Sequence, residues 1–203
     1  MRRLAVLGPP PADRHSVVEL IAGRLGVPTV SMHTVLQAEF RAQSPASVEF
    51  RRFMDAGELV PDETLLPVLL AHLDGPGFVL DGFPHTAVQA EALTAALAGR
   101  GTPLDRVVDL VLTDGEVLRR VTGRRVCRGC GKVWHIEPDL DRCDRCGGEV
   151  FQRDDDAEWH VTARLQSFRS NAAPILEHYR SRGLLVSVDA TLPTGEIVEA
   201  ATC

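Results

Sequence analysis

Four cysteines stand in two close pairs, Cys127-Arg-Gly-Cys130 and Cys143-Asp-Arg-Cys146, within a segment rich in Cys, Gly, Asp and Arg. Thiolates at this C-x2-C-x12-C-x2-C spacing are typical zinc ligands and can close a tetrahedral shell around Zn²⁺. Because the protein would fill all four positions, none remains open for water, and the metal would be structural. The sequence therefore predicts a small zinc ribbon.

The neighbours of these cysteines favour the same interpretation. Gly131 follows the first pair and Gly147 the second, where glycine lets the backbone turn so that amides point back at the thiolates. His135 lies nearby, but four sulfurs suffice and we leave it out of the ligand set. The alternative is two reduced or disulfide-linked pairs. The apolar part of the N-terminus is too short for a secretory signal, which favours a cytoplasmic protein and metal binding. Cys203 is expected to be an exposed terminal thiol.

Length and composition limit the class of protein. The chain has 203 residues, 44% hydrophobic and 25% charged, which suits one packed domain with a small insert and argues against general disorder. No apolar run approaches ~20 residues, so no membrane span is expected. The net charge of −6 argues against a nucleic-acid partner or an anionic membrane. A nucleic-acid-binding zinc ribbon remains a third hypothesis, ranked last because acidic residues in the cysteine segment offset the basic ones.

Short apolar runs alternate with stretches of helical periodicity along the chain. Such alternation predicts a mostly parallel sheet that is covered by helices on both faces. We expect strands at residues 4–7, 27–30, 77–80, 107–112 and 184–188, and helices at residues 16–25, 35–40, 48–54, 61–73, 87–97, 115–121, 157–180 and 195–201.

Several motifs occur together and in one order. They are Gly8-Pro9-Pro10, Met54-Asp55-Ala56-Gly57-Glu58-Leu59-Val60, Asp81-Gly82-Phe83-Pro84, Gly123-Arg124-Arg125-Val126, the cysteine pairs, and Arg153-Asp154-Asp155-Asp156. In order and spacing, and over nearly the whole chain, they resemble the adenylate kinases with a zinc-containing lid.

The resemblance implies an α/β fold: a P-loop-type three-layer sandwich with a parallel sheet, a helical flap and a four-cysteine zinc-ribbon lid. The core would comprise residues 1–30, 61–122 and 157–203, the flap for a nucleoside monophosphate residues 31–60, and the lid residues 123–156. It also implies a monomer that binds ATP and a nucleoside monophosphate, with Mg²⁺ accompanying ATP if the protein is active. Lid closure would exclude water from the site.

The resemblance also assigns roles to individual residues. Arginine suits phosphoryl transfer because its planar fork meets phosphate oxygens two at a time. A single surface arginine is usually solvated. Asp81 resembles the acidic residue that helps hold Mg²⁺ through water, although an aspartate after a strand often only forms a turn. Gln89 resembles the residue that reads the monophosphate base, although a lone glutamine is often just an exposed helix residue. The implied catalytic residues are Arg120, Arg124, Arg153, Arg164 and Asp81, and the implied nucleotide-binding residues are Gly8, Arg14, Ser16, Gln89 and His85.

The chain departs from the family at the loop that binds the phosphates. Pro11, Asp13 and His15 replace glycines, and Arg14 replaces a lysine. Pro11 has no N–H to offer, and Asp13 adds a carboxylate where a polyanion should lie. At ~4 Å, two like charges repel by roughly 4 kcal/mol at an effective dielectric constant of about 20. Ser16 keeps a hydroxyl that could contact Mg²⁺. We therefore expect weak ATP binding.

The acceptor site departs as well, because the family's two phosphate-binding arginines are replaced by Gln37 and His85. AMP recognition should be weak unless protonated His85 or His33 substitutes for them. Two functions compete on this basis. One is reversible phosphoryl transfer from ATP to a nucleoside monophosphate, with weakened or altered activity. The alternative is a catalytically inactive homologue that acts as a binding or regulatory protein.

Overall fold

A five-stranded sheet forms the centre of the molecule. The computed structural model describes residues 2–9, 12, 14–56, 58, 60–134 and 141–203, so that Pro11, Asp13 and His135 lie outside the described residues. The strand order is β2-β3-β1-β4-β8 and every neighbouring pair is parallel, which confirms the predicted sheet. The strands are β1 (Arg3–Leu7), β2 (Thr29–Ser31), β3 (Phe78–Asp81), β4 (Arg106–Val111) and β8 (Leu185–Asp189).

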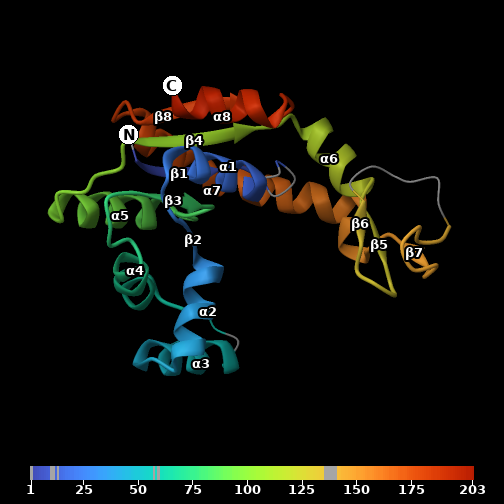
Figure 1. Cartoon of the computed structure of the whole chain (residues 1–203), viewed down its shortest axis with the longest axis horizontal. Coiled ribbons are helices and arrows are strands. Elements are labelled where there is room, and N and C mark those ends of the chain that lie inside the picture. Colours follow the sequence, from blue (N-terminus) through green and yellow to red (C-terminus); the bar gives the residue numbers. More distant parts are fainter. Residues whose placement is uncertain (1, 10–11, 13, 57, 59, 135–140) are drawn as a thin grey trace.

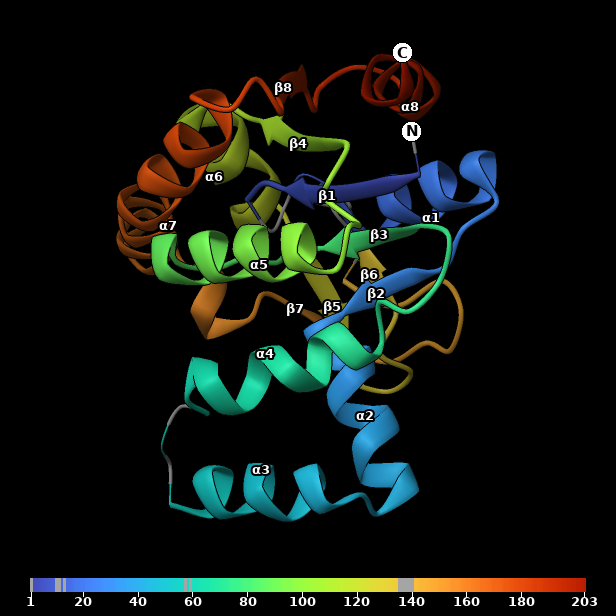
Figure 2. The same cartoon turned by 90° about the vertical axis from the view of Figure 1, so that its left-hand side faces the viewer.

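Alternate side chains of the central strand β1 enter two separate cores. Leu4 and Val6 pack on one face of the sheet, and Ala5 and Leu7 on the other, as the two-residue repeat of a strand requires. The first core is completed mainly by α1 (Arg14–Leu25), α6 (Asp114–Thr122) and α8 (Thr194–Thr202), and the second by α4 (Asp62–Ala71) and α5 (Ala87–Gly99). The long helix α7 (Glu158–Arg180) contributes to both (Figure 2). The result is the predicted layered α/β fold.

Two further helices extend away from the sheet on the flap side. Figure 1 shows α2 (Met32–Ala42) descending directly from β2 and α3 (Pro45–Asp55) lying across its end. Helix α2 begins three residues before the predicted start at residue 35. The cause is a capping box: Ser31 accepts a hydrogen bond from the Thr34 amide, and the Thr34 hydroxyl accepts one from the Ser31 amide.

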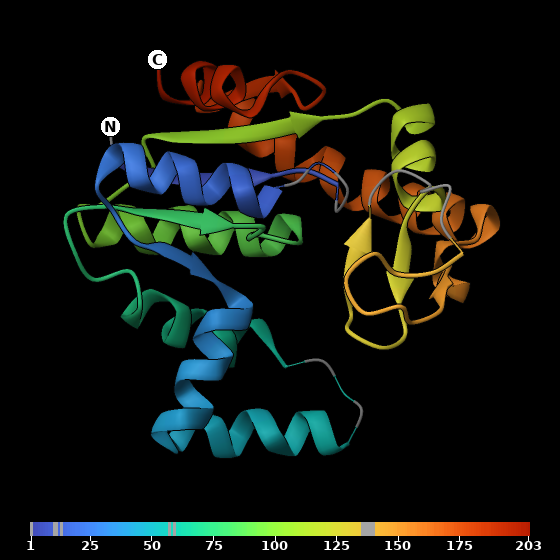
Figure 3. The same cartoon turned by 45° about the vertical axis from the view of Figure 1, so that its right-hand side comes forward.

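A small antiparallel sheet carries the cysteines on the opposite side of the molecule. Its strands are β5 (Arg125–Cys127), β6 (Val133–Trp134) and β7 (Val150–Phe151), in the order β6-β5-β7. It lies between α6 and α7 and projects from the core opposite α2 and α3 (Figure 3). A 3-10 helix, Asp154–Asp156, leads from β7 to α7. The division into core, flap and lid at the predicted boundaries stays a prediction.

Among the described residues, none of the helices is both long enough and apolar enough to span a bilayer.

Candidate active site and metal centre

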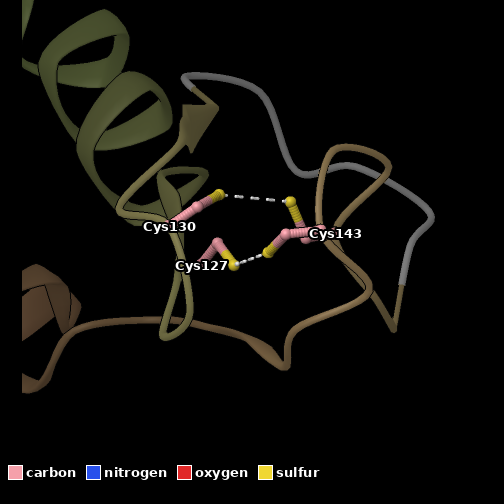
Figure 4. Close-up of side chains that lie close together, drawn as sticks. Cys127, Cys130 and Cys143 are labelled. Atoms are coloured by element: carbon pink, nitrogen blue, oxygen red, sulfur yellow. Dashed lines mark hydrogen bonds between the residues drawn. The ribbon is translucent and has the colours of Figure 1, made fainter.

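The four predicted metal ligands lie together. Their sulfur atoms are all within 4.8 Å of one another, contributed by two turns that face each other (Figure 4). Across the gap, Cys127 Sγ is 3.4 Å from Cys146 Sγ, and Cys130 Sγ is 3.6 Å from Cys143 Sγ. Four sulfurs at about 2.3 Å from a central Zn²⁺ would be separated by roughly 3.8 Å, so the cluster fits a tetrahedral metal site. That the metal is Zn²⁺ stays a prediction.

Glycine and backbone amides shape this cluster. Gly131 and Gly147 adopt φ values of 69° and 71°, a conformation that side chains disfavour. The amide of Gly129 lies 3.3 Å from Cys127 Sγ, and the amide of Arg145 lies 3.3 Å from Cys143 Sγ. Hydrogen bonds from backbone amides, first that of Cys130 and then that of Gly129, help lower the pKa of Cys127 to about 6. These amides therefore favour the thiolate form of Cys127, whereas the neighbouring cysteines raise the pKa of Cys146 to about 12.

On the loop side, the structure brings together Gly8, Arg14 and Asp81. Gly8 follows β1, Asp81 ends the neighbouring strand β3, and Arg14 begins α1. Arg14 Nε donates to Asp81 Oδ1 at 2.5 Å, and Arg14 Nη1 donates to the Gly8 carbonyl oxygen at 3.0 Å. His15 Nδ1 lies 3.3 Å from Asp81 Oδ2. Ser16, in the same turn of α1, is exposed.

This arrangement does not fit the predicted role of Asp81 as an indirect Mg²⁺ ligand. One carboxylate oxygen is bound to a guanidinium and the other contacts an imidazole nitrogen. Mg²⁺ keeps most of its water and binds through carboxylate oxygens, which here are already engaged by the chain itself. Mg²⁺ as a companion of ATP stays a prediction, and no chemical step below is routed through it.

A cavity of about 320 Å³ lies beside this ion pair. Leu7, Phe168, Ala172, Ile175 and Leu176 give it an apolar wall. Its polar or backbone lining comes from Gly8, Arg14, Gly82, Pro84, His85, Asp109 and Asn171. Gly8, Arg14 and His85 thus face one space, and helix α7 forms much of its wall.

Two titratable groups in this cavity have shifted pKa values. Desolvation, followed by the positive charge of Arg14, lowers the pKa of His85 below its usual 6.5. Burial raises the pKa of Asp109 above its usual 3.8. Our sequence analysis missed Asp109, although a single carboxylate within the apolar strand Val107–Leu112 was a usable signal. His85 is therefore neutral at pH 7 and does not replace the charge of an arginine.

On the flap side, the predicted base-reading residue is held by other residues. Gln89 Nε2 donates to Asp62 Oδ1 at 2.6 Å, and Gln89 Oε1 accepts from the His85 amide at 2.8 Å. Gln37 Nε2 lies 2.9 Å from His33 Nε2 on the same face of α2. Both glutamines are thus engaged by groups of their own chain, and neither carries a positive charge for an acceptor phosphate.

On the lid side, three of the four predicted arginines meet at adjacent carboxylates. Arg124 donates through Nε, at 2.8 Å, and Nη2 to the two oxygens of Asp156, whose side chain is fully buried. Arg153 Nε lies 3.1 Å from Asp155 Oδ1, and Arg164 donates to the carbonyl oxygen of Asp155. The base of the lid therefore gathers three guanidiniums around Asp155 and Asp156.

The fourth arginine, Arg120, is held apart from this group. Its Nε donates to Glu116 Oε1 at 2.6 Å, and its Nη2 donates to the Ala190 carbonyl oxygen at 3.2 Å. Hydrogen bonds from Arg119 and then Arg120 lower the pKa of Glu116 to about 2. Glu116 is thus ionised at neutral pH and fixes Arg120 on α6.

The arrangement agrees with the relatives of the chain. The sequence model of the adenylate kinase family matches residues 6–184. An adenylate kinase from Salinispora tropica is 45% identical, over 96% of this chain and 94% of that protein. One from Acidothermus cellulolyticus is 41% identical over 98% and 95%, and one from Archaeoglobus fulgidus is 38% identical over 93% and 90%. The parallel sheet, the four-cysteine cluster, the family model over residues 6–184 and the near-complete coverage by these relatives lead to one conclusion: the chain belongs to the adenylate kinase family.

Proposed function

We propose that this protein transfers a phosphoryl group reversibly between ATP and a nucleoside monophosphate, AMP by family membership, and that it does so weakly. The observation that supports transfer is the group of three guanidiniums at the base of the lid. Arg124, Arg153 and Arg164 are assembled around the two carboxylates Asp155 and Asp156. Phosphate oxygens offer the same acceptor geometry as a carboxylate, and can take over the contacts that Asp155 makes with Arg153 and Arg164.

Each arginine has a distinct part in this proposal. Arg153 and Arg164 are about half exposed, and a pair of that kind contributes little to stability, so both can leave Asp155 for a phosphate. Arg124 is fixed by a buried carboxylate and keeps the base of the lid in place. Closure of the lid over the polyphosphate would exclude water from the transfer. The metal at the cysteines maintains the structure of the lid and supplies no chemistry to the reaction.

Two features support weakened activity. Arg14, the cation of the loop, is hydrogen-bonded to Asp81 and to the Gly8 carbonyl oxygen. On the acceptor side, His85 is neutral at pH 7 and Gln37 carries no charge. Both sites for phosphate therefore offer few available positive charges to stabilise the transferred group. The same contacts favour the second candidate function, an inactive family member that binds a nucleotide or a partner.

A coupled assay on purified protein distinguishes the two functions. We expect slow ADP formation from ATP and AMP, and a further loss of about 10²-fold in kcat/KM on Arg164→Ala, the scale of losing one transition-state donor. Arg180→Ala is the matched control, because Arg180 lies on the same helix, is similarly exposed and forms its ion pair with Glu177. Absence of turnover would support the inactive binding protein, whereas turnover that Arg164→Ala leaves unchanged would overturn the role proposed for Arg164.

A further inference from the structure

Asp81 is paired with a cation of its own chain, Arg14. The resemblance to the family would instead place a divalent cation from solution near this carboxylate. The Arg14–Asp81 contact of 2.5 Å is a charge-assisted hydrogen bond between side chains that are 28% and 12% exposed. His15 contacts the second oxygen of the carboxylate. The carboxylate is therefore both neutralised and largely shielded from water.

The guanidinium of Arg14 is also packed in place. Besides Asp81, it donates to the Gly8 carbonyl oxygen, which ties it to the loop after β1. It lies against the backbone of Gly82, where a Cβ would be only 2.5 Å from Arg14 Nη2. Gly82 has a φ of 72°, which glycine adopts freely and other residues rarely do. Arg14 thus occupies a fitted position rather than a loose surface orientation.

We propose that Arg14 takes the place of the divalent cation at this edge of the sheet, so that the protein binds the metal-free form of ATP at least as tightly as the magnesium complex. This inference rests on the proposed nucleotide site. A hydrated Mg²⁺ at Asp81 would have to displace a guanidinium that makes two hydrogen bonds, and it sheds its own water reluctantly. The magnesium complex of ATP also carries two fewer negative charges, which weakens its attraction to the lid arginines.

Two substitutions should act in opposite directions. Asp81→Asn removes a negative charge from the polyphosphate site and releases Arg14, so metal-free ATP should bind more tightly. If Asp81 served a metal instead, the same substitution would weaken ATP binding in magnesium. Arg14→Gln leaves the Asp81 carboxylate without its guanidinium, so magnesium should now improve ATP binding. The sign of each change separates a built-in cation from a metal ligand.

Calorimetric titration with ATP, in chelator-free buffer depleted of divalent cations and in excess MgCl₂, tests the proposal. For the wild type we expect magnesium to leave the Kd unchanged within about twofold or to raise it. Asp81→Asn should tighten metal-free ATP by about fivefold to tenfold, equivalent to the loss of one screened like-charge contact. Arg14→Gln should weaken metal-free ATP by about tenfold and make magnesium favourable. The control is Asp74→Asn, which makes the same chemical change at a carboxylate that lies before β3 and pairs with Arg100, and it should change neither Kd.

The outcomes separate this inference from the proposed function. Magnesium that tightens ATP binding to the wild type by about tenfold or more would overturn the built-in cation and leave the nucleotide site intact. ATP binding in neither buffer would overturn both. Thermal unfolding of each variant checks its fold. If Asp81→Asn does not fold, the wild type and Arg14→Gln decide the question, because their responses to magnesium are expected to differ in sign.

Discussion

The loop and the lid both hold arginines on carboxylates of the same chain, but at different depths. Arg14 and Asp81 are 28% and 12% exposed, whereas Arg164 and Asp155 are 54% and 45% exposed. An exposed pair contributes at most about 1 kcal/mol and exchanges partners readily, while a shielded pair is costly to separate. In the proposed function, the lid arginines would therefore move to a phosphate more easily than Arg14 would.

The base of the lid repeats this contrast at short range. Arg124 is bound by two hydrogen bonds to the fully buried Asp156, and one residue earlier Asp155 holds Arg153 and Arg164 at the surface. In the proposed function, the Arg124–Asp156 pair fixes the position of the lid. Asp155 holds Arg153 and Arg164, which can exchange it for another anion. Asp155 and Asp156 thus differ in their proposed roles, and the observed difference between them is that Asp156 is buried and Asp155 is exposed.

The largest expected effect comes from the metal, because the arginines of the lid depend on its fold. Zinc contributes an apparent free energy on the order of 10 kcal/mol in small domains that it organises. Cys143→Ser, or a strong chelator, should release about one metal ion per chain and remove hydrogen-exchange protection from the lid amides of Gly131 and Gly147, which bond to the carbonyl oxygens of Cys127 and Cys143. The parallel sheet should keep its protection. Elemental analysis combined with exchange measurements checks this, and metal-free protein with fully protected lid amides would contradict it.

The next largest expected effect is the difference in free energy of unfolding between variants of Asp156 and Asp155. Asp156→Ala leaves Arg124 facing a buried, vacated site and should lower the free energy of unfolding by about 3 kcal/mol. Asp155→Ala should lower it by less than about 1 kcal/mol, because its partners are half exposed. Urea denaturation of both variants provides the measurement. Equal losses would remove the distinction between the fixed and the exchangeable pair.

A double-mutant cycle sharpens the contrast between loop and lid. For Arg14 and Asp81 we expect a coupling free energy of about 1–2 kcal/mol, since the pair is shielded and charge-assisted. For Arg164 and Asp155 we expect about 0.3 kcal/mol or less. Replacing each residue by alanine, singly and together, gives both values from urea denaturation at one pH. A lid coupling as large as the loop coupling would mean that depth of burial does not govern the release of these arginines.

The smallest expected effect concerns His85, whose pKa is lowered below 6.5. A phosphate ligand favours the protonated imidazole, so binding takes up a proton and AMP affinity should rise as the pH falls from 7.5 to 5.5, by at most about tenfold. The phosphate of AMP itself titrates near pH 6 and changes affinity on its own account. His85→Asn is therefore the control, and it should lose only the part of the pH dependence that the imidazole causes. An identical pH profile for wild type and His85→Asn would exclude that role.

Much of the fold was predictable because its signals are local. Short apolar strands and helical periodicity placed each expected element within a few residues of its observed position. The predicted strand at residues 27–30 starts later, at Thr29, because the Val27 amide instead bonds to the Ala22 carbonyl oxygen and ends α1. The early start of α2 has a similar cause, since Thr34 takes the capping position more often filled by Glu or Gln.

The partners of the site residues could not be predicted in the same way. The cysteine cluster was predictable because the spacing within each pair already sets the sulfur geometry. Asp81 and Arg14, in contrast, are 67 positions apart, and their contact depends on which strands become neighbours and on the absence of a side chain at Gly82. The shifted pKa values of His85 and Asp109 likewise depend on the cavity that α7 closes. The proposed roles of the arginines and of Gln89 remain predictions.

The Arg124–Asp156 pair also joins the chain entering the lid to the chain leaving it, 32 positions later. Because this pair holds the two ends of the lid together, the attachment of the lid to the core does not depend on the number of residues between them. Closing a loop costs only about (3/2)RT ln n, so residues can be added or removed beyond this fastening at little thermodynamic expense. The lid of a relative with four cysteines should accordingly replace this lid without loss of the core fold, provided that Arg124 and Asp156 are kept.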